Sequence, residues 1–171
     1  MVSGSCSLAT HEQVRVFRAS GRPARAIDPL AIAIGDDDAE RVLAWAAPLL
    51  NDGPVLVYAT AEAAAVQAVQ STLGVAQVGE LVERTLARIA VGLVERGVRQ
   101  LVVAGGETSG AVVQALGVQQ MTIGPQIDPG VPWTAARSPV CAGEVLHLAL
   151  KSGNFGATDF FTKAFERIAT P

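Results

Sequence analysis

Hydrophobic residues recur at intervals of three and four between residues 76 and 96, which is the spacing of one face of an α-helix. This apolar face consists of Val78, Val82, Leu86, Ile89 and Leu93, and charged residues occupy the positions between them. Gly97, directly after this helix, is a typical helix C-terminal residue. Residues 98–104 that follow include three valines and end in the unbroken apolar run 101–104, as expected of a strand covered by helices on both faces. The pattern therefore predicts a helix that leads into a buried, parallel strand.

The same alternation continues through most of the chain. It predicts further strands at 55–58, 121–123 and 145–150, and a strand end at 2–3. It predicts further helices at 11–19, 39–50, 61–68, 111–116 and 159–168. Alternating helices and strands indicate an α/β fold, with a layered, mostly parallel sheet flanked by helices, as in Rossmann-like nucleotide-binding domains.

Residues 124–143 contain four prolines: Pro125, Pro129, Pro132 and Pro139. We expect no regular structure in this segment. Long ordered loops of this kind are commonly lids or binding loops.

Length and composition favour one well-buried domain over residues 1–171. Half of the 171 residues are hydrophobic and only 17% are charged, which excludes disorder as the main state. Met1 directly precedes the first strand end without leader residues, which suggests a fragment or an excised domain. A net charge of −3 offers no basic surface for nucleic acid or anionic lipid.

No apolar run approaches the roughly 20 residues that a membrane-spanning helix needs, and no signal peptide is visible. We expect a cytoplasmic protein without nucleic-acid or membrane partners. Cys6 and Cys141 fit reduced thiols. Because His11 and His147 lie far apart and no Cys-x-x-Cys pair is present, we expect no metal bound by protein ligands alone.

Glycine and hydroxyl residues gather at three points where a predicted strand ends. Residues 105–110, Gly-Gly-Glu-Thr-Ser-Gly, precede a predicted helix whose first amides and dipole would favour an anion. Residues 151–156, Lys-Ser-Gly-Asn-Phe-Gly, could add the point charge of Lys151. Residues 3–7, Ser-Gly-Ser-Cys-Ser, form the third point, with Thr10 close behind. Ligands of parallel sheets bind beyond the carboxyl ends of the strands, so these turns are candidates for one site.

Each turn alone also allows a purely structural interpretation. Thr108 or Ser109 could simply cap the following helix, and Lys151 could lie free in a solvated loop. Residues 105–110 lack the lysine of a Walker A loop, and Glu107 stands where a dinucleotide fingerprint has its second glycine. Cys6 fits a small packed residue better than a nucleophile, because no histidine partner is identified. The acidic run 36–38 fits a solvated helix start better than a metal cluster.

Taken together, these segments resemble the C-terminal nucleotide-binding domain of the four-carbon acid sugar kinase family. The matching segments lie in order over nearly the whole chain: 2–7 with Thr10 and Gln13, then 103–110, 127–133 and 148–156. The resemblance implies an ATP-dependent kinase acting on small acids such as threonate, erythronate or an oxo-tetronate. ATP, with Mg²⁺ held by the nucleotide, would be its cofactor.

The resemblance also implies which residues contact the nucleotide. They are Ser3, Ser5, Gly105, Gly106, Glu107, Thr108, Ser109, Lys151, Gly153 and Asn154. In this family a separate N-terminal domain binds the sugar acid and has an Asp-Asp-x-Thr-Gly motif with the catalytic base. Here Asp37 and Asp38 precede Ala39-Glu40-Arg41, so no base can be assigned and we expect the chain alone to be inactive.

Two other functions stay open at this point. One is an NAD-type dinucleotide-binding oxidoreductase domain, since a strand, a glycine turn and a helix serve NAD as well. The other is a stand-alone, non-catalytic nucleotide-binding module. The specific acid and the oligomeric state, including a homo-oligomer, are also open.

Overall fold

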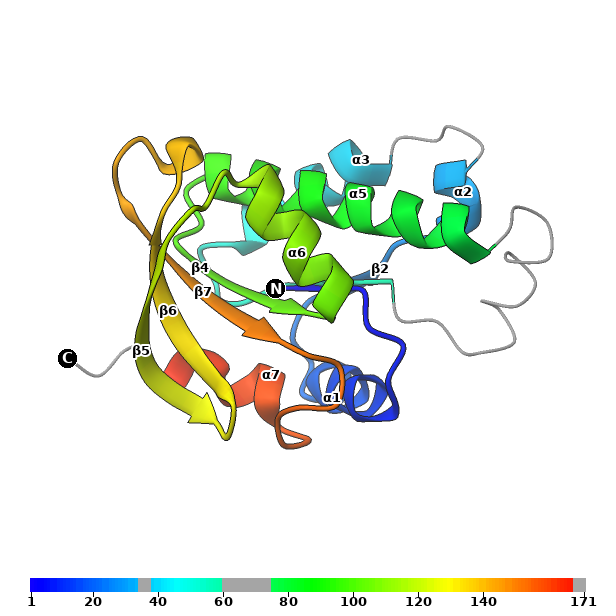
Figure 1. Cartoon of the computed structure of the whole chain (residues 1–171). Helices are drawn as coiled ribbons and strands as arrows, with labels where there is room; N and C mark the ends of the chain where they lie inside the picture. The colour runs from blue at the N-terminus through cyan, green and yellow to red at the C-terminus, as the bar shows by residue number, and fades with distance from the viewer. Residues whose placement is uncertain (34–37, 60–74, 168–171) are drawn as a thin grey trace.

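The computed structural model describes residues 1–33, 38–59 and 75–167, which form one seven-stranded sheet with helices on both faces (Figure 1). The strand order is β2-β3-β1-β4-β7-β6-β5. The strands are β1 Val2–Ser3, β2 Ala24–Ala26, β3 Leu56–Tyr58, β4 Gln100–Ala104, β5 Met121–Asp128, β6 Val131–Arg137 and β7 Val145–Lys151. The prediction of a layered, mostly parallel α/β fold is confirmed.

The helices divide between the two faces of the sheet (Figure 1). The α-helices are α1 Leu8–Ala19, α2 Pro29–Ala33, α3 Asp38–Ala46, α5 Val75–Glu95, α6 Gly106–Ala115 and α7 Phe160–Lys163. The described residues also include the 3₁₀ segments η1 Ala47–Leu49, η2 Pro139–Cys141 and η3 Ala164–Arg167. One buried cluster packs α3, α5 and α6 against the sheet, and a second packs α1 and α7 against the other face. Among the described residues, no helix is long and apolar enough to cross a membrane.

Five strands run parallel, and this brings three strand ends together. β4 pairs with β1 on one side and with β7 on the other, both in parallel. The register places Ser3 opposite Ala104, and Ala104 opposite Lys151. The turns that follow β1, β4 and β7 therefore leave the same edge of the sheet side by side.

The prediction of an irregular segment over 124–143 is wrong for residues 124–137. β5 and β6 form an antiparallel hairpin there, and β6 pairs antiparallel with β7. Prolines are accommodated because β5 is the edge strand and its register with β6 shifts between Ile123 and Gln126. Pro132 precedes the first β6–β7 pair, which joins Trp133 to Ala149, so its missing N–H does not interrupt that ladder.

Several element boundaries also differ from the prediction. α6 begins at Gly106 rather than at residue 111, so the glycine-rich segment is itself the first turn of the helix. β2 and α2 were not predicted, because three and five residues give little periodicity. The predicted helix 159–168 is the short α7 followed by η3. The helix predicted over 61–68 lies outside the described residues.

Candidate functional site

Three turns meet at the carboxyl ends of β1, β4 and β7. We call them the serine turn (residues 4–7), the α6 turn (residues 105–109) and the β7 turn (residues 152–157). Gly4 N–H donates to Ala104 O at 2.9 Å, and Gly105 N–H donates to Lys151 O at 2.8 Å. Backbone hydrogen bonds thus extend the sheet into the turns and fix them relative to one another.

The three turns approach so closely that two positions require glycine. A Cβ atom on Gly153 would lie 2.6 Å from Ser5 Oγ, which puts the β7 turn directly against the serine turn. A Cβ atom on Gly105 would lie 2.9 Å from Thr108 Oγ1 and 3.3 Å from Ser5 N. Gly105 also has a φ of 118°, which an L side chain rarely adopts. Ser5 is therefore the common neighbour of the other two turns.

The α6 turn presents helix amides without protein acceptors. Gly105 is the N-cap of α6 and has no side chain to cap it, and the first helical bond runs from Ser109 N–H to Gly105 O at 2.9 Å. Within the part of the chain that the structure describes, no acceptor meets the amides of Gly106, Glu107 and Thr108. The interpretation of Thr108 or Ser109 as the cap is wrong. The three amides and the helix dipole together favour an anion.

The serine turn leads into α1. Ser7 is its N-cap and accepts from Thr10 N–H at 3.2 Å. Ser7 Oγ and Thr10 Oγ1 both donate to Gly153 O, at 2.6 and 2.8 Å. The start of α1 therefore holds the β7 turn through hydroxyl groups.

Lys151, the last residue of β7, is completely buried. Its Nζ donates to Thr10 Oγ1 at 2.9 Å, to Gly153 O at 2.9 Å and to Ser152 O at 3.2 Å. Burial lowers the pKa of Lys151 to about 8, because the ammonium loses hydration. The interpretation of Lys151 as a free lysine in a solvated loop is wrong.

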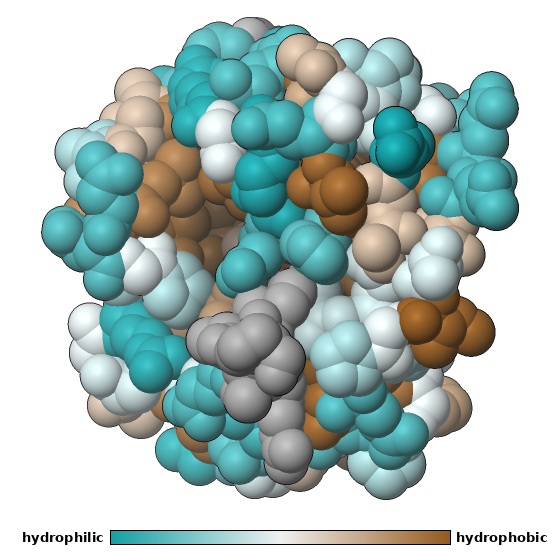
Figure 2. All heavy atoms as spheres, turned by 90° about the vertical axis from the view of Figure 1, so that its left-hand side faces the viewer, coloured by the Kyte–Doolittle hydropathy of each residue, from teal (hydrophilic) through white to brown (hydrophobic). Residues whose placement is uncertain are grey.

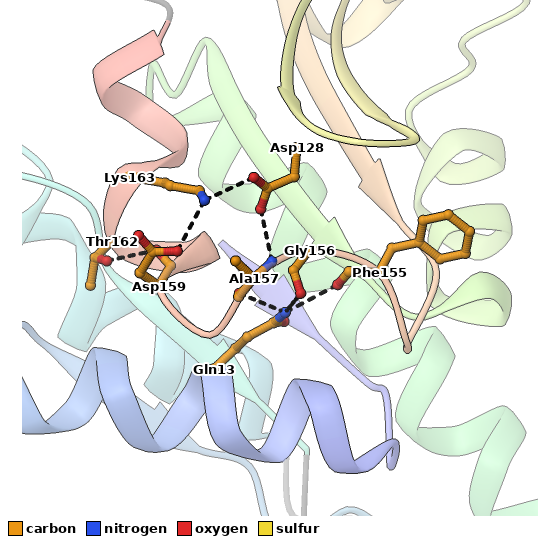
Figure 3. A network of polar contacts seen from close by, with 8 residues as sticks. All are labelled: Gln13, Asp128, Phe155, Gly156, Ala157, Asp159, Thr162 and Lys163. Atoms are coloured by element: carbon orange, nitrogen blue, oxygen red, sulfur yellow. Dashed lines mark hydrogen bonds and ion pairs between the residues drawn. The ribbon is translucent and has the colours of Figure 1, made fainter.

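Gln13, on α1, holds the far end of the β7 turn (Figure 3). Its side chain is buried, and Nε2 donates to the carbonyl oxygens of Phe155, Gly156 and Ala157 at 2.9 to 3.0 Å. Gln13 Oε1 is buried and has no partner among the described residues. Three consecutive carbonyls of the turn are thus directed toward α1 and the protein interior.

Asp128, at the end of β5, fixes the next amide of the turn (Figure 3). Its Oδ2 accepts from Ala157 N–H at 2.9 Å, and its Oδ1 lies 2.8 Å from Lys163 Nζ. Lys163 also pairs with Asp159 at 3.0 Å. The hydrogen bond to Asp128 is the largest cause that raises the pKa of Lys163. This network joins the β5–β6 hairpin and α7 to the β7 turn.

Two carboxylates lie beside the α6 turn. Glu107 is exposed in the first turn of α6. The pKa of Glu83, on α5, is raised by burial and, to a lesser extent, by the charge and hydrogen bond of Glu107. The side chains of Glu83 and Glu107 therefore lie close together beside the first turn of α6.

The structure brings the ten residues expected to contact the nucleotide into this one region, but in different settings. Ser3, Ser5, Gly105, Thr108 and Lys151 are buried, whereas Gly106, Glu107 and Asn154 are exposed. Ser109 Oγ is buried without a partner among the described residues. Cys6 and Cys141 are free thiols, and Cys6 is exposed rather than packed as expected.

Sequence reasoning assigned no role to Gln13, Asp128 or Lys163. Gln13 and Asp128 did lie in segments that resembled the kinase family, and this was the one available signal. Their contacts cross up to 144 residues of sequence, so local patterns could not reveal them.

A hollow of about 550 Å³ lies elsewhere, over the outer strands, and is lined by residues that include Thr122, Ala135 and Arg137. The side of the molecule shown in Figure 2 is mostly hydrophilic, with hydrophobic residues in separate places and in a hollow. Volume alone therefore does not locate the site. The unpaired amides at the strand ends point to the three turns as the stronger candidate.

Comparison with known proteins finds relatives that match nearly the whole chain. A 3-oxo-tetronate kinase from Burkholderia multivorans is 58% identical over 168 residues, and one from Pseudomonas fluorescens is 53% identical over 169 residues. These matches cover 98% and 99% of this chain but 38% of each relative, so the chain spans little more than a third of their length. A crystal structure of a Haemophilus influenzae protein matches with a TM-score of 0.87 and 40% identity, over 96% of this chain and 39% of that one.

A family model described as a nucleotide-binding C-terminal domain matches residues 1–161, which include all three turns, Asp128 and Gln13. The chain therefore belongs to the family of nucleotide-binding C-terminal domains.

Proposed function

We propose that this chain is the ATP-binding domain of a kinase that phosphorylates a small four-carbon sugar acid of the threonate, erythronate or 3-oxo-tetronate type. The observation that supports it most is the meeting of the α6 and β7 turns, which offer amides without protein acceptors at one sheet edge. The relatives named 3-oxo-tetronate kinase support the reaction class and the acid.

The geometry suits phosphoryl transfer, which depends mainly on positioning and on charge stabilisation. Gly106, Glu107 and Thr108 would donate amides to one part of the phosphate chain, and Gly153 and Asn154 to another. Ser5 lies between them and would contribute its hydroxyl. Each helix-end interaction contributes typically about 0.3 to 1 kcal/mol, so convergence of several donors is what gives useful affinity.

Mg²⁺ would accompany the nucleotide. The residues present fit such an ion, because Glu107 offers a carboxylate in the same turn as the amides and Mg²⁺ prefers oxygen ligands. No cluster of three metal-ligating side chains occurs among the described residues, so the phosphates would supply part of the coordination. The ion would neutralise charge on the transferred group.

The acid and the catalytic base would belong to the rest of the kinase. This chain corresponds to only 38% of the relatives' length, which leaves room for a separate sugar-acid domain. Residues 1–171 would then be the nucleotide-binding domain, inactive alone. Free thiols at Cys6 and Cys141 are compatible with the cytoplasmic location that we predict.

Calorimetric titration of the purified chain tests the nucleotide site. We expect heats of binding for ATP and ADP with Mg²⁺, and NADH should not displace ATP. No heat or thermal shift at millimolar ATP would contradict the proposal, and displacement by NADH would favour the dinucleotide alternative.

A second experiment tests the kinase reaction. The chain would be joined to the remaining part of the Burkholderia 3-oxo-tetronate kinase, and ADP release would be followed with each of the three acids. We expect release with at least one acid. A chimera that folds and binds ATP but never releases ADP would favour the non-catalytic module.

A further inference from the structure

Lys151 is an ammonium group enclosed by neutral partners. It is fully buried, and each of its three protons has an acceptor: Thr10 Oγ1, Ser152 O and Gly153 O. No ion pair involving Lys151 is found in residues 1–33, 38–59 and 75–167. Burying a charge without a counter-ion is costly, and an apolar side chain would fill the same place without that cost. The charge therefore calls for an explanation beyond folding.

The two carbonyl partners of Lys151 belong to the peptide units that form the start of the β7 turn. The Ser152 carbonyl shares its peptide unit with Gly153 N–H, and the Gly153 carbonyl shares its unit with Asn154 N–H. Neither of these N–H groups has a hydrogen-bond partner among the described residues. Described peptide bonds are all trans, so in each planar unit the N–H points opposite to the C=O. With both carbonyls directed at the buried ammonium, both N–H groups point away from it.

The hydroxyls reinforce this orientation at the second unit. Gly153 O also accepts from Ser7 Oγ and from Thr10 Oγ1, so the unit that ends in Asn154 N–H is held from one side by three donors. A charged donor on the carbonyl polarises the peptide unit and strengthens its N–H as a donor, because hydrogen bonds in a chain reinforce one another. The positive charge of Lys151 thereby strengthens two amide donors, Gly153 N–H and Asn154 N–H, that the ammonium does not contact.

We propose that Lys151 is a positioning residue that acts on the nucleotide phosphates through these two peptide units rather than by direct contact. Lys151 orients the Gly153 and Asn154 amides and polarises them, while its own protons stay bonded to Thr10, Ser152 and Gly153. This inference rests on the proposed function, because it assumes that a nucleotide phosphate lies against the β7 turn. It differs from the direct contact expected from the sequence.

The binding test compares the wild-type chain with Lys151→Met, which keeps the length of the side chain and removes its charge. We expect affinity for ATP and ADP to fall roughly tenfold, as for loss of one charge near a phosphate in a partly screened site, and affinity for adenosine to stay within about twofold. Equal loss for adenosine, or no loss for ATP, would overturn the inference. Absence of nucleotide binding by the wild-type chain would instead overturn the proposed function, and with it this role.

Carbon-detected NMR on the chain without nucleotide tests the arrangement even if Lys151→Met fails to fold. Cys6 is replaced by serine so that the serine turn carries no thiol. Between pH 7 and 9.5 the carbonyl carbons of Ser152 and Gly153 should shift together as Lys151 loses its proton, while carbonyl carbons in α5 should not. Carbonyl resonances of the turn that ignore this titration would contradict the proposed polarisation.

The same resonances separate positioning from direct contact. At pH 7 with saturating ADP, we expect the Ser152 and Gly153 carbonyls to stay at the positions of the ammonium-bonded state or to shift further from their high-pH positions, because a phosphate on the N–H polarises the same peptide unit in the same direction. If Lys151 turned to grasp a phosphate, both carbonyls would lose their charged donor and move toward their high-pH positions. That result would replace the positioning role with a direct one.

Discussion

The α6 turn and the β7 turn offer the same kind of group, a backbone amide without a protein acceptor, but different interactions hold them. The α6 amides are fixed by the helix itself, whose N-cap Gly105 has a positive φ and makes no side-chain capping hydrogen bond. The β7 turn has no regular structure, and side chains of α1, β5 and β7 bind its backbone groups one by one. One half of the site is thus a local property of its own sequence, and the other depends on distant residues.

Blocking the α6 turn should produce the largest effect on binding. A Cβ atom at Gly106 meets nothing within 4 Å and the residue has no positive φ, so Gly106→Leu can fold normally. Its side chain would occupy space beside the helix amides, and we expect ATP affinity to fall roughly a hundredfold, as for loss of about three helix-end contacts of up to about 1 kcal/mol each. Calorimetry measures the affinity and thermal unfolding checks the fold.

The matched control is Gly110→Leu. Gly110 lies one turn further along α6, and a Cβ atom added there would also meet nothing within 4 Å, so this variant adds the same side chain away from the first amides. It should bind ATP as the wild type does. Similar losses in both variants would argue against the helix start as the phosphate site.

Removing the anchor of the β7 turn on β5 should weaken folding. Asp128→Ala removes the acceptor of Ala157 N–H and the partly buried partner of Lys163, and we expect the free energy of unfolding to fall by about 2 kcal/mol. Asp159→Ala removes the other, more exposed partner of the same lysine and should cost about 0.5 kcal/mol. Urea unfolding measures both, and equal costs would contradict the anchoring role of Asp128.

How much of the fold could be predicted follows from the range of the forces involved. The bounds of the long helix α5 and the buried strand β4 were predicted within one or two residues. The spacing of apolar residues within each element already indicates which side chains it buries. The β5–β6 hairpin was not, because four prolines suggested irregular structure. Only the sheet order shows that β5 is an edge strand, where a missing N–H costs little.

The same distinction between local and distant interactions applies to the candidate site. Glycines and hydroxyls at strand ends identified all three turns, because close backbone approach and free helix amides require those residue types in sequence. The state of Lys151 could not be predicted, since its burial is created by Thr10 and Gly153 from opposite ends of the chain. No local pattern indicates that a lysine beside two glycines lies beneath the turn.

The smallest expected effect is a pH dependence that comes from the β7 turn alone. The α6 turn contains no lysine, histidine or cysteine. Burial lowers the pKa of Lys151 from its ordinary value of 10.5 to about 8, so the unfolded chain binds more protons than the folded one between these values. The free energy of unfolding should therefore rise as the pH increases through that window.

ADP affinity should change in the opposite direction, falling by up to roughly tenfold between pH 7.5 and 9.5 as the charge behind the Gly153 and Asn154 amides disappears. Both trends should be absent from Lys151→Met, with Cys6→Ser in both proteins. Parallel trends in stability and affinity would mean that the affinity change reports folding rather than the charge of Lys151.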